Sequence, residues 1–373
     1  MKTGRHWKKA ALGLSLALAF AAVQAQIVVG ETVGVTGAVA ATVKEALIGA
    51  RLYIDWVNAT GGIKGEKIDL ITLDDHFDVK KAVENTRFLI EEKNAVVLFM
   101  DRGTPHTQAI MPLLAKNQIA LVAPSTGAML LHKPVNKYIF NVRAPYQREA
   151  AKAIEHLTTL GINRIAVVHV NDAFGADAME GAKHGFDAAK IKPVAEITAD
   201  RDKPDYKKIV PPIVASKAQA VLWIGSGTAV SEGIKALRAA GSAAQIVTLS
   251  NNASEGFIKL MGDAGKGVIV TQVFPYERSY AYPFIQEALQ IAKESGVNEL
   301  SPAILEGFAG AKVLVEALKR AGPHPTRAKV LAALEHMNKF DLGGLEVSYS
   351  PTDHTGLQFA DLSIIGADGR FRR

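Results

Sequence analysis

The sequence alternates short apolar runs, rich in β-branched residues, with longer segments whose apolar residues recur every three or four positions. In the first part of the chain the short runs are Ile27 to Val29, Ile68 to Leu73, Ala95 to Met100 and Ile119 to Val122. Buried strands that alternate with helices are typical of a parallel sheet covered by helices on both faces. The pattern therefore predicts an α/β fold.

A second set of alternations starts near residue 147. Its predicted strands cover residues 165–170, 194–198, 220–224, 246–250 and 268–273. A single core of the combined size would normally divide in two. We therefore expect two similar Rossmann-like lobes with parallel sheets, and a chain that crosses between them more than once. The tail from Leu345 to Phe371 is predicted to form short strands and turns.

The first 25 residues have the pattern of a secretory signal peptide. Four basic residues precede an apolar run over residues 10–22, and a small residue suited to cleavage follows at Ala25. This run is too short for a membrane span, which needs about 20 apolar residues, and no later stretch approaches that length. We expect cleavage after Ala25, export to the periplasm and a mature chain that is not inserted in the membrane.

Charge and cysteine content exclude other classes of protein. Removing the four basic residues of the leader lowers the formal net charge from +6 to +2, and no clustered basic stripe remains. Nucleic acid is therefore not an expected partner. The chain has no cysteine, so hydrophobic cores must stabilise it without disulfides and no lipid can be attached behind the leader.

Common catalytic and cofactor motifs are absent from the sequence. The segment Gly225-Ser226-Gly227 lacks the spacing of a nucleophile elbow, and Val230 occupies the third glycine position of a dinucleotide-binding loop. No Walker loop is present, the histidines are scattered singly, and cysteine is unavailable for zinc. We expect no catalytic residue, no metal and no cofactor, and hence a protein that is not an enzyme.

One acidic cluster keeps a catalytic hypothesis open. Asp74, Asp75, His76 and Asp78 directly follow a predicted strand, at the edge where ligands bind in open α/β sheets. Acids in such loops more often cap the next helix. A secreted hydrolase that uses Asp74, Asp75 and His76 is therefore the least favoured of three functional hypotheses.

Seven short segments are weak signals individually but specific in their order and spacing. They are residues 34–37 (GVTG), 58–65 (NATGGIKG), 74–75 (DD), 103–109 (GTPHTQA), 123–128 (APSTGA), 140–143 (FNVR) and 171–175 (NDAFG). Together they resemble the branched-chain amino acid binding proteins, of leucine/isoleucine/valine type, that serve ABC importers. The resemblance extends over nearly the whole mature chain.

This resemblance implies a type I periplasmic binding fold, in which a three-stranded hinge joins two lobes and the ligand cleft lies between them. The first lobe would comprise residues 26–144 and 275–339, and the second residues 145–274 and 340–373. The implied partners are a small-molecule solute and an ABC permease and ATPase complex in the inner membrane.

Candidate ligand-binding residues of the first lobe follow predicted strands and precede helices. Hydroxyls and free backbone N–H groups at such positions point toward an anion. The resemblance implies that Thr104 donates its hydroxyl to a ligand carboxylate, and that Ser125, Thr126, Gly127 and Ala128 form the adjoining contact segment. Ser125 and Thr126 would equally serve as helix N-caps.

Candidates from the second lobe complete the implied site. Phe174 occupies the loop position where the family has an aromatic residue, although it could equally be local core. Ser226 and Gly227 match the next ligand-facing position, without the tyrosine that branched-chain amino acid binders often have there. Tyr276 lies where the chain returns to the first lobe and is a further candidate to line the cleft.

The main departure from the family is at Asn251 and Asn252, near which amino acid binders place an acid for the ligand's ammonium group. A buried cation without a counter-charge is costly. Either Asp75 or Glu255 supplies that acid, or the ligand lacks an ammonium. Arg102 adds a cation that favours a carboxylate, or it is a solvated surface residue.

The leading functional hypothesis is capture of a small carboxylate-bearing solute, an amino acid or a related organic acid, by closure of the two lobes. The closed form would then be recognised by an importer. A ligand-sensing receptor subunit of a signalling system has the same fold and is the second hypothesis.

Overall fold

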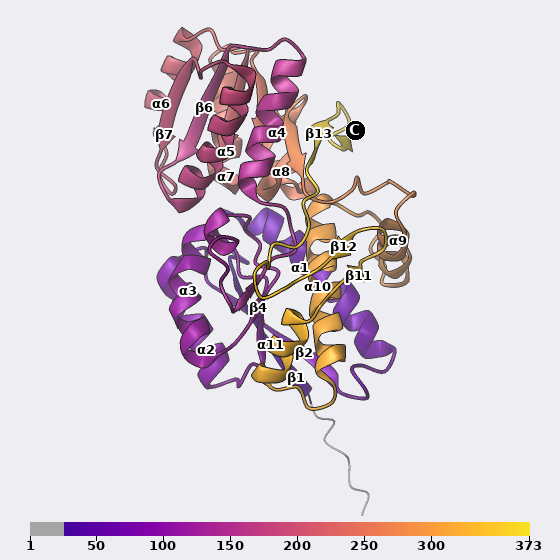
Figure 1. The fold of residues 1–373 in the computed structure, drawn as a ribbon. Coiled ribbons are helices and arrows are strands. Elements are labelled where there is room, and N and C mark those ends of the chain that lie inside the picture. Colours follow the sequence, from indigo (N-terminus) through magenta and orange to yellow (C-terminus); the bar gives the residue numbers. More distant parts are fainter. Residues whose placement is uncertain (1–25) are drawn as a thin grey trace, which may run out of the picture.

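The computed structural model describes residues 26–373, and the predicted leader with its cleavage site after Ala25 lies outside the described residues. The chain forms two α/β lobes, one above the other in Figure 1, and crosses between them after residues 140, 272 and 357. The predicted fold class, two lobes with parallel sheets and a hinge of three segments, is confirmed.

The first lobe contains a five-stranded sheet in the order β2-β1-β3-β4-β5, and every pair in it is parallel. Its strands are β1 (Gln26–Val33), β2 (Lys67–Asp74), β3 (Val97–Phe99), β4 (Leu121–Val122) and β5 (Ile139–Phe140). Its other elements are α1 (Ala40–Ala59), α2 (Val79–Glu91), α3 (Thr104–Asn117), η1 (Met129–Leu131), α9 (Pro283–Glu294), α10 (Pro302–Ala321), α11 (Arg327–Glu335), β11 (Phe340–Asp341) and β12 (Glu346–Val347).

The second lobe contains a seven-stranded sheet in the order β14-β13-β10-β9-β8-β6-β7, in which only the last two strands of the chain are antiparallel to their neighbours. Its strands are β6 (Ile165–Val170), β7 (Ala195–Ala199), β8 (Ala220–Ile224), β9 (Gln245–Thr248), β10 (Ile269–Gln272), β13 (Asp361–Ile365) and β14 (Phe371–Arg372). Its helices are α4 (Tyr146–Thr159), α5 (Ala173–Ala189), α6 (Tyr206–Ala215), α7 (Gly227–Ala239), η2 (Ser250–Asn252), α8 (Glu255–Met261) and η3 (Gly262–Gly265).

Each sheet is covered on both faces, as its continuous apolar strands predict. Successive residues of a strand point to opposite faces. In β3, Val97 and Phe99 belong to one buried cluster and Leu98 belongs to another. In β6, Ala166 and Val168 pack on one face of the second sheet while Val167 packs on the other. Burial on both faces explains why these strands do not alternate apolar with polar residues.

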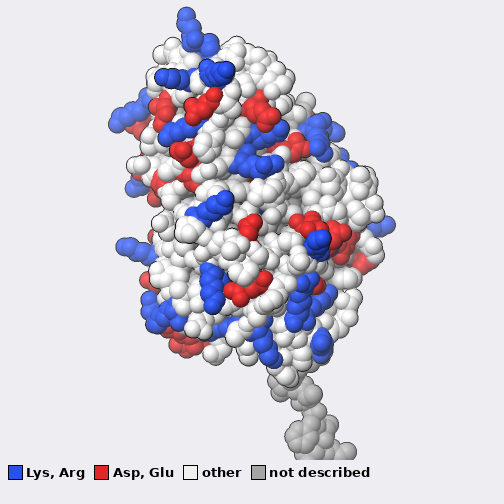
Figure 2. All heavy atoms as spheres, in the orientation of Figure 1, with Lys and Arg blue, Asp and Glu red and all other residues white. Residues whose placement is uncertain are grey.

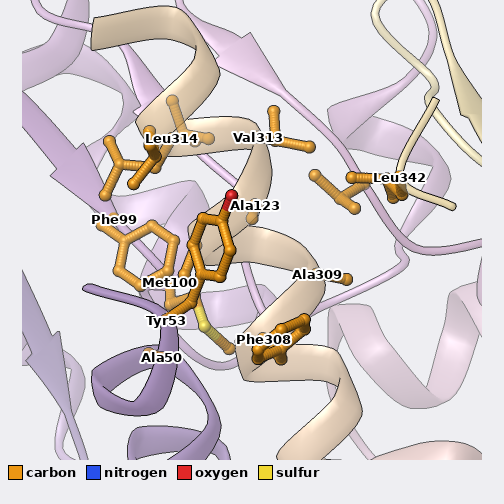
Figure 3. Packing of buried hydrophobic residues seen from close by; sticks show 14 of the residues in the cluster. Ala50, Tyr53, Phe99, Met100, Ala123, Phe308, Ala309, Val313, Leu314 and Leu342 are labelled. Carbon is orange, nitrogen blue, oxygen red and sulfur yellow. The ribbon is translucent and has the colours of Figure 1, made fainter. Parts of the chain in front are cut away.

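The largest core of the first lobe lies between its sheet and the pair of long helices α1 and α10. Tyr53 and Phe308 meet edge to face with ring centroids 5.1 Å apart, next to Phe99 of the sheet (Figure 3). Glycines allow the two helices to approach closely, because a β-carbon on Gly49 would lie 1.8 Å from the carbonyl oxygen of Ile304. This packing joins α1, α10 and the sheet in one core.

Residues 340–357 pack on the first lobe, which differs from the predicted boundary that placed residues 340–373 in the second. Leu342, Val347 and Leu357 are buried in the same cluster as Phe99, and Leu342 lies beside α10 in Figure 3. The Lys312 ammonium of α10 also donates to the carbonyl of Leu342 (2.7 Å). The second sheet receives only β13 and β14, so we place the boundary near residue 358.

The surface carries charges of both signs on both lobes, and lysine and arginine are interspersed with aspartate and glutamate on the face shown in Figure 2. Within residues 26–373 no helix combines the length and the apolar character needed to cross a membrane.

Candidate ligand-binding site

The ends of strands from both sheets meet where the lobes face each other, and they enclose a small cavity. Its volume is about 10 Å³, far below the usual range for ligand pockets of about 300–1,000 Å³, so the lobes are closed tightly over this site. Each lobe contributes five of its lining residues, which are Phe77, Arg102, Gly103, Thr104, Ser125, Tyr146, Phe174, Arg201, Ser226 and Asn251. A solute therefore reaches these residues only if the lobes move apart.

Thr104 and Thr126, which follow adjacent strands, lie side by side. Thr104 is the first residue of α3, and its hydroxyl oxygen is 2.7 Å from that of Thr126. Parallel strands bring their carboxyl ends to one edge of the sheet, which explains this proximity. Thr104 lines the cavity, whereas Thr126 lies behind it as a fully buried partner.

Gly127 and Ala128 support the hinge and do not line the cavity. The N–H of Tyr146 donates to the carbonyl of Gly127 (2.7 Å), and a β-carbon on Gly127 would lie 2.6 Å from the carbonyl oxygen of Ala144. Ala128 is fully buried, and its carbonyl accepts from the N–H of Leu131 (3.0 Å). Gly127 and Ala128 were predicted to contact the ligand, but in the structure they pack within the protein near the hinge.

Arg102 connects the two lobes across the cavity. It is only 4% exposed, which contradicts the alternative of a solvated surface arginine. Its guanidinium donates to the hydroxyl of Ser125 (3.1 Å) in its own lobe and to the carbonyl of Asn251 (2.7 Å) in the other. Ser125 in turn donates to Glu306 (3.0 Å). Within residues 26–373 no carboxylate forms an ion pair with Arg102, and burial lowers the pKa of its guanidinium.

Aromatic side chains form much of the remaining wall. Phe174 is the second residue of α5, and its ring centroid lies 4.7 Å from that of Tyr146. Phe77, which the sequence analysis did not single out, stacks on His106 with ring centroids 4.5 Å apart. The guanidinium of Arg201 lies 5.2 Å from the centre of the Phe77 ring, on the side of the second lobe.

The two asparagines have different roles. Asn251 lines the cavity, and its amide donates to the hydroxyl of Ser226 (2.9 Å), while its buried side-chain oxygen has no hydrogen-bond partner. Asn252 lies behind the cavity, where its side-chain oxygen accepts from the N–H of Gly227 (2.8 Å) and its amide donates to Thr248 (2.9 Å). Asn251 is therefore the candidate contact, and Asn252 holds the loop before α7.

Two predicted contacts lie away from the cavity. Asp75 is completely buried and accepts from the N–H of Phe77 (2.7 Å) and the hydroxyl of Thr32 (3.2 Å), and burial raises its pKa to about 6. It positions Phe77 and does not line the cavity. Tyr276 donates its hydroxyl to the carbonyl of Phe371 (3.1 Å) and packs against the second lobe.

The acidic residues on which the hydrolase hypothesis depends stabilise a turn and cap a helix. Asp74 accepts from the hydroxyl of Thr36 (2.7 Å) and the N–H of His76 (2.9 Å), and neither Asp74 nor His76 lines the cavity. Asp78 caps α2 by accepting from two backbone N–H groups. No group of three or more potential metal-ligating side chains occurs in the described part of the chain.

Two α/β lobes that enclose a small polar cavity at their hinge define a two-lobed solute-binding protein. The chain belongs to the periplasmic binding protein family, whose model matches residues 26–367. The resemblance to branched-chain amino acid binding proteins is confirmed by this match and by similar proteins that are named Leu/Ile/Val-binding proteins.

Similar proteins share the architecture over nearly their whole length. A substrate-binding periplasmic protein from Ralstonia solanacearum is 32% identical, with a TM-score of 0.86 over 92% of this chain and 99% of that one. The Leu/Ile/Val-binding protein homolog 3 of Brucella melitensis is 22% identical over 335 residues, 89% of each chain. A branched-chain amino acid ABC transporter structure from Thermus thermophilus, with bound valine, has 20% identity and a TM-score of 0.82, over 94% of this chain and 95% of that one.

Proposed function

We propose that this protein captures a small carboxylate-bearing solute in the cleft between its lobes and presents it to an ABC permease and ATPase complex. The proposed location is the periplasm, after removal of the leader. The observation that carries the proposal is the buried Arg102 guanidinium, which lines a cavity closed by both lobes and has no carboxylate partner within residues 26–373.

A carboxylate would satisfy several donors of this cavity together. Arg102 offers positive charge, Thr104 offers a hydroxyl, and α3 begins at Thr104 with its N-terminal N–H groups turned to the same end of the sheet. A helix N-terminus and a guanidinium both favour an anion. A buried cation without a counter-charge is costly, so an anionic ligand would stabilise the closed form.

Closure of the lobes gives the protein two forms that a permease can distinguish. Hydrogen bonds cross the cleft, among them the bond from Arg102 to Asn251 and the bond from the N–H of Thr228 to the carbonyl of Ala38 (3.0 Å). Bonds of this kind can exchange with water when the lobes separate. The named relatives are binding proteins, which supports a function without catalysis.

The test is a thermal-shift screen of the mature chain with small carboxylates, repeated on the Arg102→Met variant. A ligand that binds only the native state raises the melting temperature by mass action. We expect carboxylates to raise it, and Arg102→Met to weaken binding roughly 30-fold or more, the effect of removing one partner of a buried charge pair.

Arg148→Met, which removes an exposed arginine of α4, is the matched control and should bind like the parent protein. Unchanged binding by Arg102→Met, or turnover of a substrate, would contradict the proposal.

A further inference from the structure

The charges around the cavity restrict what kind of acid it can hold. Its lining includes two arginines and no aspartate or glutamate. Arg201 is paired with Asp172, the N-cap residue of α5. Arg102 forms no direct ion pair within the described residues, and Glu306, the carboxylate with the strongest influence on it, does not line the cavity.

Two carboxylates close to Arg102 have hydrogen-bond partners of their own. Glu306 accepts from Ser125 and lies 3.5 Å from the guanidinium of Arg143. Glu31 borders a separate space that shares only Arg102 and Ser125 with the cavity, and it accepts from the hydroxyl of Thr72 (2.8 Å). Neither one lines the cavity, so neither reaches a ligand there.

We infer that the cleft selects carboxylates that lack an ammonium group, and that an aromatic carboxylate is its preferred class of ligand. This inference rests on the proposed function. A ligand carboxylate neutralises Arg102, whereas the ammonium of an amino acid would add a second positive charge with no acid to pair with it. The unpartnered side-chain oxygen of Asn251 accepts a hydrogen bond but carries no charge to compensate an ammonium.

Three aromatic rings in the wall favour a flat aromatic ligand. Phe77, Tyr146 and Phe174 make up three of the ten lining residues. Phe77 is held from behind by His106, and Tyr146 is held by Phe174 and by Arg143, whose guanidinium lies 4.5 Å from its ring centre. Rings that are already fixed lose little freedom when an aromatic ligand packs against them.

Matched pairs of ligands test the inference by calorimetric titration of the mature protein. One pair is L-phenylalanine and 3-phenylpropanoate, and the other is L-leucine and 4-methylpentanoate; within each pair only the ammonium group differs. We expect the acid without the ammonium to bind at least tenfold more tightly in both pairs, and 3-phenylpropanoate to bind more tightly than 4-methylpentanoate.

A charge-changing variant provides an independent test. Asn251→Asp places a carboxylate in the cavity wall at nearly constant volume. We expect it to bind 3-phenylpropanoate at least tenfold more weakly and L-phenylalanine more tightly than the parent protein does. Asn163→Asp, the same change at an exposed position of the second lobe, should leave both affinities unchanged.

The outcomes separate the inference from the proposed function. Tighter binding of the amino acid in each pair overturns the inference and leaves solute capture intact. Tighter binding of 4-methylpentanoate than of 3-phenylpropanoate overturns the preference for an aromatic body. If none of these acids or amino acids binds, the proposed capture of a small carboxylate fails, and the inference fails with it.

Discussion

At the scale of single residues, the hinge contains a buried charged cluster that joins the lobes. Arg143 is fully buried and donates to Glu149 and to the hydroxyl of Ser250 (2.5 Å). Glu149 is also fully buried and accepts from the N–H of Ser250 (3.0 Å) and from Thr271. Breaking such a pair on one side leaves an uncompensated buried charge, which costs far more than the loss of an exposed pair.

We therefore predict that Glu149→Ala lowers the free energy of unfolding by about 3–5 kcal/mol. The control is Glu155→Ala on the same helix, where an exposed carboxylate pairs with Lys152 at 3.2 Å, and where the expected loss is at most about 0.5 kcal/mol. Urea denaturation measures both. Similar losses for the two variants would contradict a structural role for the buried cluster.

Gly227 is the residue whose replacement should affect closure most selectively. It has a positive φ of 52°, and a β-carbon there would lie 1.9 Å from the carbonyl oxygen of Ala38, which belongs to the other lobe. Gly241 in the same lobe has a positive φ of 79° and no atom within 4 Å of such a carbon. The two glycines therefore share a backbone preference, but only Gly227 contacts the opposite lobe.

We predict that Gly227→Ala and Gly241→Ala each lower the free energy of unfolding by about 1–2 kcal/mol, the cost of a left-handed conformation. Only Gly227→Ala should also weaken the binding of 3-phenylpropanoate, by at least about tenfold, or 1.4 kcal/mol. Urea denaturation and calorimetric titration provide the two measurements. Equal affinities for the two variants would show that Ala38 and Gly227 do not meet in the bound form.

At the scale of elements, buried carboxyl groups lie in or just after the first three strands of the chain. Burial raises the pKa of Glu31 in β1 to about 7, that of Asp75 after β2 to about 6, and that of Asp101 after β3 to about 8. The folded state then binds more protons than the unfolded state between pH 4 and these values. Their contribution to stability is therefore complete at low pH and is lost as the pH rises through about 6–8.

Two histidines of the same lobe have the opposite dependence, because burial lowers the pKa of His106 and of His132 to about 4. Their contribution is complete above about pH 6.5 and is lost as the pH falls toward 4. From pH 6.5 to 8.5 the carboxyl groups therefore dominate, and we predict that the free energy of unfolding decreases over this interval. Urea denaturation at several pH values should show a smaller decrease for Glu31→Gln, and an unchanged slope would contradict the prediction.

At the scale of the whole molecule, the strands and the first-lobe contacts could be predicted because they depend on local patterns. Apolar runs define buried strands, and residues after neighbouring parallel strands meet, as Thr104 and Ser125 do. Phe77 and Arg201 had no such signal, since each comes from an irregular loop and enters the cavity only because the lobes face each other. Residues 340–357 were assigned to the wrong lobe for the same reason: residues such as Leu342 could be buried against either core.

The contacts between the lobes determine how a ligand enters and leaves. Glu45 of α1 accepts from the N–H groups of Glu255 and Gly256 at the start of α8, and the hydroxyl oxygens of Thr42 and Ser254 are 3.0 Å apart in the same region. Thr42 belongs to the first lobe and Ser254 to the second. A covalent bond between these positions would therefore hold the lobes together directly.

The chain has no native cysteine, so a disulfide between Thr42→Cys and Ser254→Cys can be formed without competing pairs. The two side-chain oxygens are 3.0 Å apart, so these side chains already meet across the cleft where a disulfide could join them. We predict that oxidation in the presence of 3-phenylpropanoate traps the ligand, that oxidation without it prevents binding, and that a reductant restores exchange. Dissociation followed by stopped flow, with Thr42→Cys alone as control, measures this. If the oxidised protein exchanges ligand as fast as the reduced protein, ligand entry does not require these parts of the lobes to separate, and capture must occur through a smaller local opening.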